Sequence, residues 1–363
     1  RDWSVTGVQT CALPICASDR AGPFAGVPYD GANPAWQDLY HAPAAPGDTD
    51  WYSTSEVWAK HWSARITDLL ESHQPDLLYS DGGIPFGAIG RSLVAEFYNS
   101  SLARNGGRLE AVYTLKDLLH KPGHGEYVEG VGVRDMERGR LAEIQPRPWQ
   151  TDTSISDWFY NQRWKTKDTG TMYRSARWVI HTLADVVSKN GNLLLNIVQR
   201  PDGALDPEVE QLLHELARWM QVNGEAIHGT RPWRVFGEGP VQSEADAPRT
   251  RQEDFAFTGR DLRFTQSKDG RAVYAIALGK PAGPELRIRA LGRAKGPSTG
   301  TIERVEVLGL PQPLRFERAD EALRLTLPSL PDDAAAVVFK ITGRELQARS
   351  EERRVGKECR SRW

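Results

Sequence analysis

Residues 173–206 read YRSARWVIHTLADVVSKNGNLLLNIVQRPDGALD, and this stretch decides the fold class. Apolar side chains recur at helical spacing as far as Lys189, and Asn190 followed by Gly191 is typical of the left-handed turn that ends a helix. The next run, NLLLNI over 192–197, is apolar apart from its Asn residues, which favours a strand buried on both faces of a parallel sheet. The stretch therefore predicts a helix that leads directly into a sheet strand.

Helices and strands alternate on both sides of this stretch. Downstream, Asp206 is expected to cap a helix that has Pro207 at its first position and runs to about Val222. Upstream, apolar spacing predicts helices over 54–72 and about 88–104, and strands over 76–80, 109–114 and about 127–133. Alternation of this kind indicates a parallel sheet with helical crossovers, which is an α/β fold.

The pattern changes beyond Trp233. Short stretches of alternating apolar residues, broken by Gly, Pro and Asp, occur at 255–266, 272–278, 301–310, 323–327 and 335–341. This pattern is typical of an all-β domain, most simply a small antiparallel sandwich. We therefore expect an α/β domain over 17–230 and a β-sandwich over 231–349.

The two ends of the chain have no apolar periodicity of either kind. Residues 1–16 and 350–363 resemble translated sequencing-adaptor DNA, and we expect them to be non-native or disordered. They hold all three cysteines, Cys11, Cys16 and Cys359. The interior from 17 to 349 therefore has no cysteine with which to form a disulfide.

Composition excludes several classes of function. The 363 residues carry a formal net charge of -2, so no electrostatic footprint for nucleic acid is present. No apolar run approaches the roughly 18 residues of a membrane-spanning helix. We find no His, Asp and Glu cluster at metal-ligand spacing and no phosphate-binding loop, so neither metal nor cofactor is expected. The 12 Trp and 10 Tyr suit either sugar binding or ordinary core packing.

Asp81 is the first candidate for chemistry. It follows the strand expected at 76–80, and catalytic groups of parallel barrels lie at the carboxyl ends of strands. The alternative is an Asp that begins a turn with Gly82 and Gly83.

Four blocks of sequence, in order, decide between these readings: QPDLLYSDGGIPFG (74–87), WQTDTSISDWFY (149–160), VSKNGNLLLNIVQRPDGALD (187–206) and NGEAIHGTRPW (223–233). Together they strongly resemble glycoside hydrolase family 29, the α-L-fucosidases, over about residues 24–240. The resemblance implies a (β/α)8-like barrel, here partial, followed by a C-terminal antiparallel β-sandwich.

The resemblance also implies catalytic roles. Asp81 matches the nucleophile of a retaining mechanism, in which a second carboxyl group roughly 5–5.5 Å away serves as acid and base. Many family members carry Trp-Glu where this chain has Trp149 and Gln150, and Gln cannot transfer a proton. The acid/base is then expected in the preceding loop, where the candidates are Glu126, Glu129, Glu137 and Glu143. We favour Glu137, because an acidic residue in that region serves in part of the family.

Sugar-binding positions follow from the same resemblance. Tyr79 matches an aromatic residue that lines the fucose pocket, and Trp158 matches one that contacts the C5-methyl face. Lys116 lies near a family Arg that hydrogen-bonds the sugar, although Lys lacks the planar fork of Arg. Trp149 is a further candidate. The alternatives are core packing for the aromatic residues and an exposed loop position for Lys116.

The expected function is that of a retaining exo-α-L-fucosidase acting on terminal fucose of glycans. About four or five barrel strands are expected before Trp233, whereas closure needs eight, so the N-terminal third of the barrel is expected to be missing and this chain alone to be inactive. The full-length parent is expected in the periplasm or secreted. The alternatives are a glycosidase of the same fold acting on a related sugar and a non-catalytic carbohydrate-binding protein, although 234–349 holds no Trp.

Overall fold

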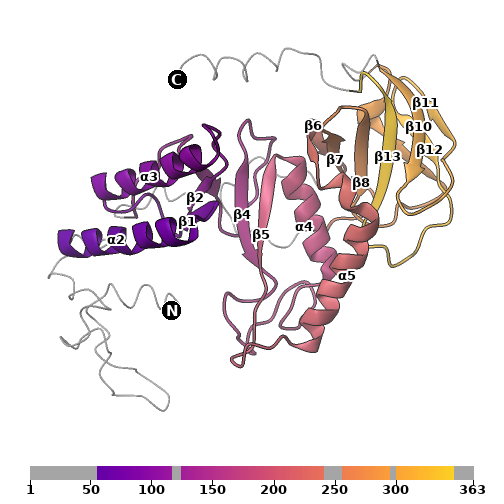
Figure 1. The fold of residues 1–363 in the computed structure, drawn as a ribbon. Helices are drawn as coiled ribbons and strands as arrows, with labels where there is room; N and C mark the ends of the chain where they lie inside the picture. Colours follow the sequence, from indigo (N-terminus) through magenta and orange to yellow (C-terminus); the bar gives the residue numbers. More distant parts are fainter. Residues whose placement is uncertain (1–54, 117–123, 241–255, 295–299, 347–363) are drawn as a thin grey trace. The chain divides into compact units, whose positions relative to one another are not determined.

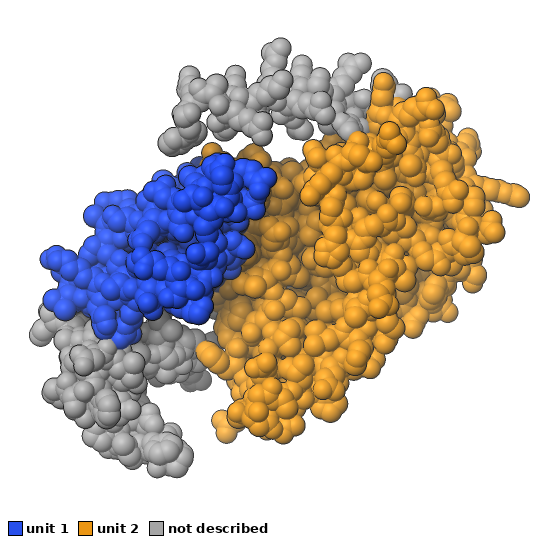
Figure 2. Space-filling model, in the orientation of Figure 1, with its two compact units in different colours: residues 1–135 blue, residues 136–363 orange. Residues whose placement is uncertain are grey.

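The computed structural model describes residues 55–116, 124–240, 256–294 and 300–346. These residues fall into two compact units, one within residues 1–135 and one within residues 136–363 (Figure 2). The predictions for residues 1–16 and 350–363 lie outside the described residues.

The first unit is a small parallel sheet covered by two helices. Strand β1 pairs in parallel with β2, and β2 with β3, and the two helices lie side by side (Figure 1). Ser55 caps the first helix by accepting a hydrogen bond from the Trp58 N–H at 3.3 Å. In chain order the elements are α2 (Glu56–His73), β1 (Leu77–Ser80), α3 (Ala88–Arg104), β2 (Val112–Lys116) and β3 (Val133–Asp135).

The second unit begins with a helix-covered parallel pair, β4 and β5. Its elements are β4 (Trp149–Ser154), α4 (Ala176–Ser188), β5 (Gly191–Asn196), α5 (Pro207–Asn223) and a short 3-10 helix (Gly224–Ala226). The predicted end of α4 is confirmed, since Asn190 adopts a left-handed φ of 71°. Gly191 is required by packing, because a Cβ there would lie 2.6 Å from the Trp149 ring and 2.6 Å from Val186.

Two local predictions in this region are wrong. Strand β5 is not buried on both faces: Leu193 and Leu195 pack among apolar residues of α4 and α5, whereas Leu194 on the other face is 48% exposed. Asp206 stands at the N-cap position of α5, but its side chain makes no capping bond. It accepts hydrogen bonds instead from the hydroxyls of Tyr173 and Tyr160, at 2.7 and 3.1 Å.

The rest of the second unit is an antiparallel sandwich, which confirms the expected architecture. A five-stranded sheet in the order β10-β13-β8-β7-β6 faces a three-stranded sheet in the order β11-β12-β9. Both sheets contribute to one apolar core, including Trp233, Phe264 and Leu323. The strands are β6 (Thr230–Glu238), β7 (Leu262–Ser267), β8 (Ala272–Ala277), β9 (Glu285–Ile288), β10 (Thr301–Val307), β11 (Phe316–Arg318), β12 (Leu323–Thr326) and β13 (Val337–Arg344), with a 3-10 turn at Arg289–Leu291.

Helix α4 joins the parallel pair to the sandwich, since it contacts β5 and also β6 and β7 (Figure 1). One hydrogen bond between α4 and the sandwich involves His181, whose Nε2 lies 2.8 Å from the carbonyl oxygen of Ala335. A carbonyl only accepts, so Nε2 carries the proton and donates. Burial lowers the pKa of His181 to about 4, and the imidazole is neutral in the folded protein at pH 7.

This histidine gives the fold a pH dependence. The pKa of an unfolded histidine is about 6.5, so between pH 6.5 and 4 the unfolded chain binds more protons than the folded one. The free energy of unfolding should therefore decrease as the pH is lowered through this window. His181 should account for a loss of about 2–3 kcal/mol by pH 4.5. Urea unfolding of wild type and His181→Gln at pH 7 and 4.5 measures the difference. Parallel pH dependence in the two proteins would contradict the assignment.

Candidate active site

Residues predicted to act in catalysis follow the carboxyl ends of strands, where parallel α/β proteins place their active sites. Asp81 comes directly after β1, Lys116 ends β2, and Glu137 comes two residues after β3. Trp158 lies in the loop after β4. Asp81, Lys116 and Tyr79 belong to the first unit, and Glu137 and Trp158 to the second.

In the first unit, Tyr79 and Lys116 both contact a fourth residue, Asp135, and Lys116 also lies near Asp81. The Lys116 ammonium lies 3.0 Å from Asp135 Oδ2 and 4.0 Å from Asp81 Oδ1. The Tyr79 hydroxyl donates to the same Asp135 oxygen at 2.7 Å. The side chains of Asp135 and Lys116 are 0% and 5% exposed, whereas that of Asp81 is 70% exposed. The ammonium therefore lies between a buried carboxylate and an accessible one.

The turn after β1 holds Asp81 in this accessible position. The Gly83 N–H donates to the His124 carbonyl at 2.8 Å, and the Ile84 N–H to the Glu126 carbonyl at 2.7 Å. A Cβ on Gly83 would lie 2.7 Å from the backbone oxygen of Glu126, so only glycine allows this close approach. The chain bends over residues 81–83, and the carboxylate of Asp81 is exposed there.

Asp135 should be essential for the stability of the first unit. Its replacement by alanine leaves the Lys116 ammonium buried and removes the acceptor of the Tyr79 hydroxyl. Breaking a buried ion pair in this way costs about 3–5 kcal/mol. Chemical unfolding of Asp135→Ala measures the loss. The matched control is Asp76→Ala, where an exposed carboxylate 3.8 Å from Arg104 should contribute less than about 1 kcal/mol. An equal loss of unfolding free energy in the two variants would show that the ion pair of Asp135 with Lys116 stabilises the fold no more than an exposed pair does.

In the second unit, the structure brings Glu137 and Trp158 together. The Trp158 indole N–H donates to Glu137 Oε1 at 3.2 Å. Buried Arg138 places its guanidinium 4.6 Å from the centre of the Trp158 ring, a cation–π arrangement. The Arg138 N–H donates to the Asp152 carbonyl at 2.8 Å, which fastens this loop to β4. An exposed carboxylate is therefore oriented by an indole that is itself held in place.

The other acid/base candidates differ from Glu137 in their hydrogen bonds. Glu126 forms an ion pair with Arg91 at 2.6 Å, as a surface carboxylate commonly does. Glu129 and Glu143 are exposed. Among the described residues, no indole donates a hydrogen bond to any of these three, whereas Trp158 donates one to Glu137.

Trp149 does not face a site. It is 2% exposed, packs in a small core with Met136 and Val186, and donates its indole N–H to the Lys189 carbonyl at 3.0 Å. It stands at the amino end of β4, opposite to the end where parallel folds bind substrate. The suggested substrate contact is therefore replaced by core packing.

Asp135 and Arg138 were not singled out from the sequence. The prediction of a strand at about 127–133 is largely wrong, because β3 (Val133–Asp135) shares only Val133 with it, and Asp135 was therefore not recognised as the end of a strand. Arg138 adopts a left-handed φ of 48°, and the neighbouring sequence does not predict this conformation. The charged residues Asp135, Glu137 and Arg138, just after the expected strand, were the available signal for both.

Comparison with known proteins identifies the family. The family model described as alpha-L-fucosidase matches residues 24–225. The chain belongs to the α-L-fucosidase family. A second model, the alpha-L-fucosidase C-terminal domain, matches residues 252–342, in the sandwich region.

Among curated fucosidases, human tissue alpha-L-fucosidase is 26% identical over 288 residues, covering 77% of this chain and 54% of the relative. The alpha-L-fucosidase of Branchiostoma floridae is 27% identical over 258 residues, covering 70% of this chain and 49% of the relative. The chain thus spans about half the length of the curated relatives it matches.

Solved fucosidase structures have the same fold. Isoenzyme 1 from Paenibacillus thiaminolyticus aligns with a TM-score of 0.59 at 17% identity, covering 83% of this chain and 68% of that structure. The Thermotoga maritima enzyme with a mechanism-based inhibitor aligns with a TM-score of 0.57 at 22% identity, covering 79% and 57%. The expected partial (β/α)8 barrel followed by an antiparallel sandwich is confirmed.

Two kinds of feature are absent from the described ranges of the chain. Among those residues, no three His, Cys, Asp or Glu side chains are grouped as ligands of one metal ion. Within the same ranges, no helix has both the length and the apolar character to cross a membrane.

Proposed function

We propose that the protein carrying this chain is a retaining exo-α-L-fucosidase that removes terminal fucose from glycans. The observation that carries the proposal is the accessible Asp81 carboxylate, held by a glycine turn at a strand end 4.0 Å from the buried ammonium of Lys116. A nucleophile must reach the substrate and remain charged, and this position meets both needs.

The reaction has two steps. In the first, an Asp81 oxygen attacks the anomeric carbon, the bond from that carbon to the leaving oxygen breaks, and Glu137 gives its proton to that oxygen. In the second, Glu137 takes a proton from water, the water oxygen attacks the same carbon, and the bond to Asp81 breaks. In retaining glycosidases the two carboxyl groups of this mechanism lie roughly 5–5.5 Å apart.

The remaining candidates would bind the sugar and orient these groups. The indole hydrogen bond from Trp158 orients the carboxyl group of Glu137. The Trp158 ring is suited to packing against the apolar C5-methyl face of fucose. Lys116 and Tyr79 are anchored by Asp135, so their polar ends can meet sugar hydroxyls without further ordering.

Structures of relatives support a covalent mechanism. A fucosidase of Bacteroides thetaiotaomicron was trapped as a covalent intermediate with 2-fluoro-fucosyl fluoride in a Glu-to-Gln variant. An Asp-to-Gly variant of the Thermotoga maritima enzyme acts as a fucosynthase. These changes fit an Asp nucleophile and a Glu acid/base, the residue types that we assign at positions 81 and 137.

The test is covalent labelling with 2-fluoro-fucosyl fluoride. It uses the product of the whole open reading frame that contains this chain, followed by peptide mass spectrometry. One fluoro-fucosyl group on the peptide with Asp81 is expected. Label on another carboxylate would overturn the assignment of the nucleophile, and fucose binding without label or turnover would favour a carbohydrate-binding protein. Faster hydrolysis of nitrophenyl galactosides than of nitrophenyl fucosides would favour a related sugar.

We propose further that the 363-residue chain alone does not hydrolyse fucosides. The parallel strands among its described residues are the five from β1 to β5, whereas a closed (β/α)8 barrel has eight. Several apolar residues of these strands are exposed, namely Leu77, Val112 and Leu194. Turnover of a nitrophenyl fucoside by the purified chain would contradict this expectation.

A further inference from the structure

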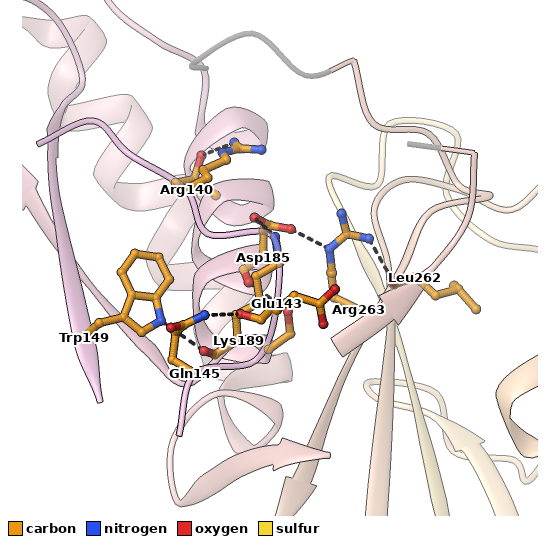
Figure 3. A network of polar contacts seen from close by, with 10 residues as sticks. Arg140, Glu143, Gln145, Trp149, Asp185, Lys189, Leu262 and Arg263 are labelled. Carbon is orange, nitrogen blue, oxygen red and sulfur yellow. Dashed lines mark hydrogen bonds and ion pairs between the residues drawn. The ribbon is translucent and has the colours of Figure 1, made fainter. Parts of the chain in front are cut away.

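A buried ion cluster lies where α4 meets the sandwich (Figure 3). It consists of Asp185 and Lys189 on α4 and Arg263 on β7, and we call these three residues the ion cluster. The Arg263 Nε lies 2.6 Å from Asp185 Oδ1, and the Lys189 Nζ 2.9 Å from Asp185 Oδ2. All three side chains are almost fully buried.

The charges of the cluster are balanced by its surroundings. Burial opposes ionisation of Asp185, but the two cations outweigh it and hold the pKa of this carboxyl well below its ordinary value. Burial likewise lowers the pKa of Lys189, and Asp185 counteracts this. Aromatic faces take up the excess positive charge, with Lys189 Nζ 4.8 Å from the centre of Phe236 and the Arg263 guanidinium 4.9 Å from that of Phe257.

Such a cluster is better suited to fixing geometry than to adding stability. Well-packed apolar residues of similar volume often stabilise a fold as much as a buried ion pair does. The directional bonds of Asp185, in contrast, set the distance and angle between α4 and β7.

The same end of α4 holds the loop that carries Glu137. We call residues 136–148 the acid/base loop. The Gln145 N–H donates to the Lys189 carbonyl at 3.2 Å, and the Asn190 side chain donates to the Gln145 carbonyl at 3.0 Å. Figure 3 shows this loop passing close to the ion cluster. The loop therefore hydrogen-bonds to the backbone of a cluster residue.

A second connection runs through Arg140 of the loop. Its guanidinium donates to Thr182 Oγ1 on α4 at 3.4 Å and lies 5.3 Å from the centre of the Phe257 ring. Arg263 covers the same ring, and Arg140 helps to lower the pKa of Asp185. The acid/base loop, α4 and the sandwich are thus connected through Arg140, Asp185 and Phe257.

We infer that Arg263 is a positioning residue. Through the ion cluster it connects the sandwich to α4, and this connection fixes the position of the acid/base loop. The inference rests on the proposed role of Glu137. Arg263 does not touch substrate in this scheme. It holds the end of α4, which holds the loop at Gln145 and Arg140, while Arg138 and Trp158 hold the part next to Glu137.

Misplaced acid catalysis has a recognisable signature. A sugar leaving group needs a proton from Glu137, whereas fluoride leaves without one. A loosened loop should therefore slow hydrolysis of fucosyl disaccharides much more than formation of the covalent intermediate from fucosyl fluoride. A merely destabilised protein would lose both activities in equal proportion.

The test compares Arg263→Met with the control Arg177→Met. Arg177 also joins α4 to the sandwich, through a 3.0 Å hydrogen bond to the Asp333 carbonyl, but none of its described hydrogen bonds involves the acid/base loop. Arg263→Met is expected to lower the ratio of disaccharide to fluoride reactivity roughly 10- to 100-fold, since misplacement by about 1 Å costs up to that much. Arg177→Met should leave the ratio within about twofold.

Hydrogen exchange separates this inference from the proposed function. In Arg263→Met the Gln145 amide should lose protection, while the Ile155 amide, bonded to the Asn196 carbonyl at 3.2 Å, keeps it. Unchanged protection at Gln145 in folded Arg263→Met would overturn the inference, as would an unchanged reactivity ratio in an active enzyme. If the wild type takes no fluoro-fucosyl label, the proposed function fails. The hydrogen-exchange result at Gln145 still decides whether Arg263 is coupled to the acid/base loop. Should Arg263→Met fail to fold, Arg263→Lys, which keeps the charge but lacks the guanidinium nitrogen that pairs with Asp185, must show the same two changes.

Discussion

Asp81→Gly is expected to lower kcat/KM on an aryl α-L-fucoside by a factor on the order of 10⁴ to 10⁶, as removal of a catalytic nucleophile commonly does. The covalent intermediate cannot form without this carboxylate. The turn should persist, because its hydrogen bonds run between the backbones of Gly83, Ile84, His124 and Glu126. Steady-state kinetics on the product of the whole reading frame measures the loss.

Rescue by azide would show that the loss of activity comes from the missing nucleophile. In the Asp81→Gly variant, azide can enter the space of the lost carboxylate and attack the anomeric carbon from that side. A single attack inverts the configuration, so the product should be β-L-fucosyl azide. The control Asp76→Ala alters a carboxylate just before the same strand and should retain activity within a few fold. Full activity in Asp81→Gly would remove Asp81 from the mechanism.

Most of the fold was predictable because its signals are local. The amphipathic spacing and Ser55 cap of α2, the Asn190 turn after α4 and Pro207 at the start of α5 each act within a few residues. The short strands β9 and β11 were not predicted, since three or four residues carry too little alternation to stand out. Strand β4 was missed because its run WQTDTS is polar, although it is largely buried in the structure.

The candidate site was predictable only in part. Asp81 and Glu137 came from family resemblance, which fixes positions in the sequence but not contacts. The bond between Trp158 and Glu137 joins residues 21 positions apart, and that between Tyr79 and Asp135 joins residues 56 apart. Pairings of this range depend on strand order and register, which a single sequence does not encode locally. For the same reason, nothing in the sequence separated the buried Trp149 from the half-buried Trp158.

Glu137→Ala is expected to lower kcat/KM on fucosyl disaccharides by about 10²- to 10⁴-fold, which is the usual contribution of a general acid. Substrates with activated leaving groups should lose less, because they need no proton in the first step. The second step also slows, since no base activates water, and the fucosyl-enzyme should accumulate as a burst. Stopped-flow measurement of aryl release detects that burst.

Three matched variants decide among the carboxylates of this region. Glu126→Ala, Glu129→Ala and Glu143→Ala each remove one charge, and only the first breaks an ion pair of the described structure, the partly exposed one with Arg91. Exposed pairs of this kind are worth about 0–1 kcal/mol, so each variant should keep activity within a few fold.

Azide again identifies the role. In Glu137→Ala, azide needs no base and attacks the fucosyl-enzyme from the side that water would use. Two successive displacements retain the configuration, so the product should be α-L-fucosyl azide, the opposite of that from Asp81→Gly. Azide rescue in Glu126→Ala, Glu129→Ala or Glu143→Ala, together with full activity in Glu137→Ala, would move the acid/base to that residue. A β-configured product from Glu137→Ala would instead mean that a single displacement operates, and the retaining mechanism would have to be abandoned.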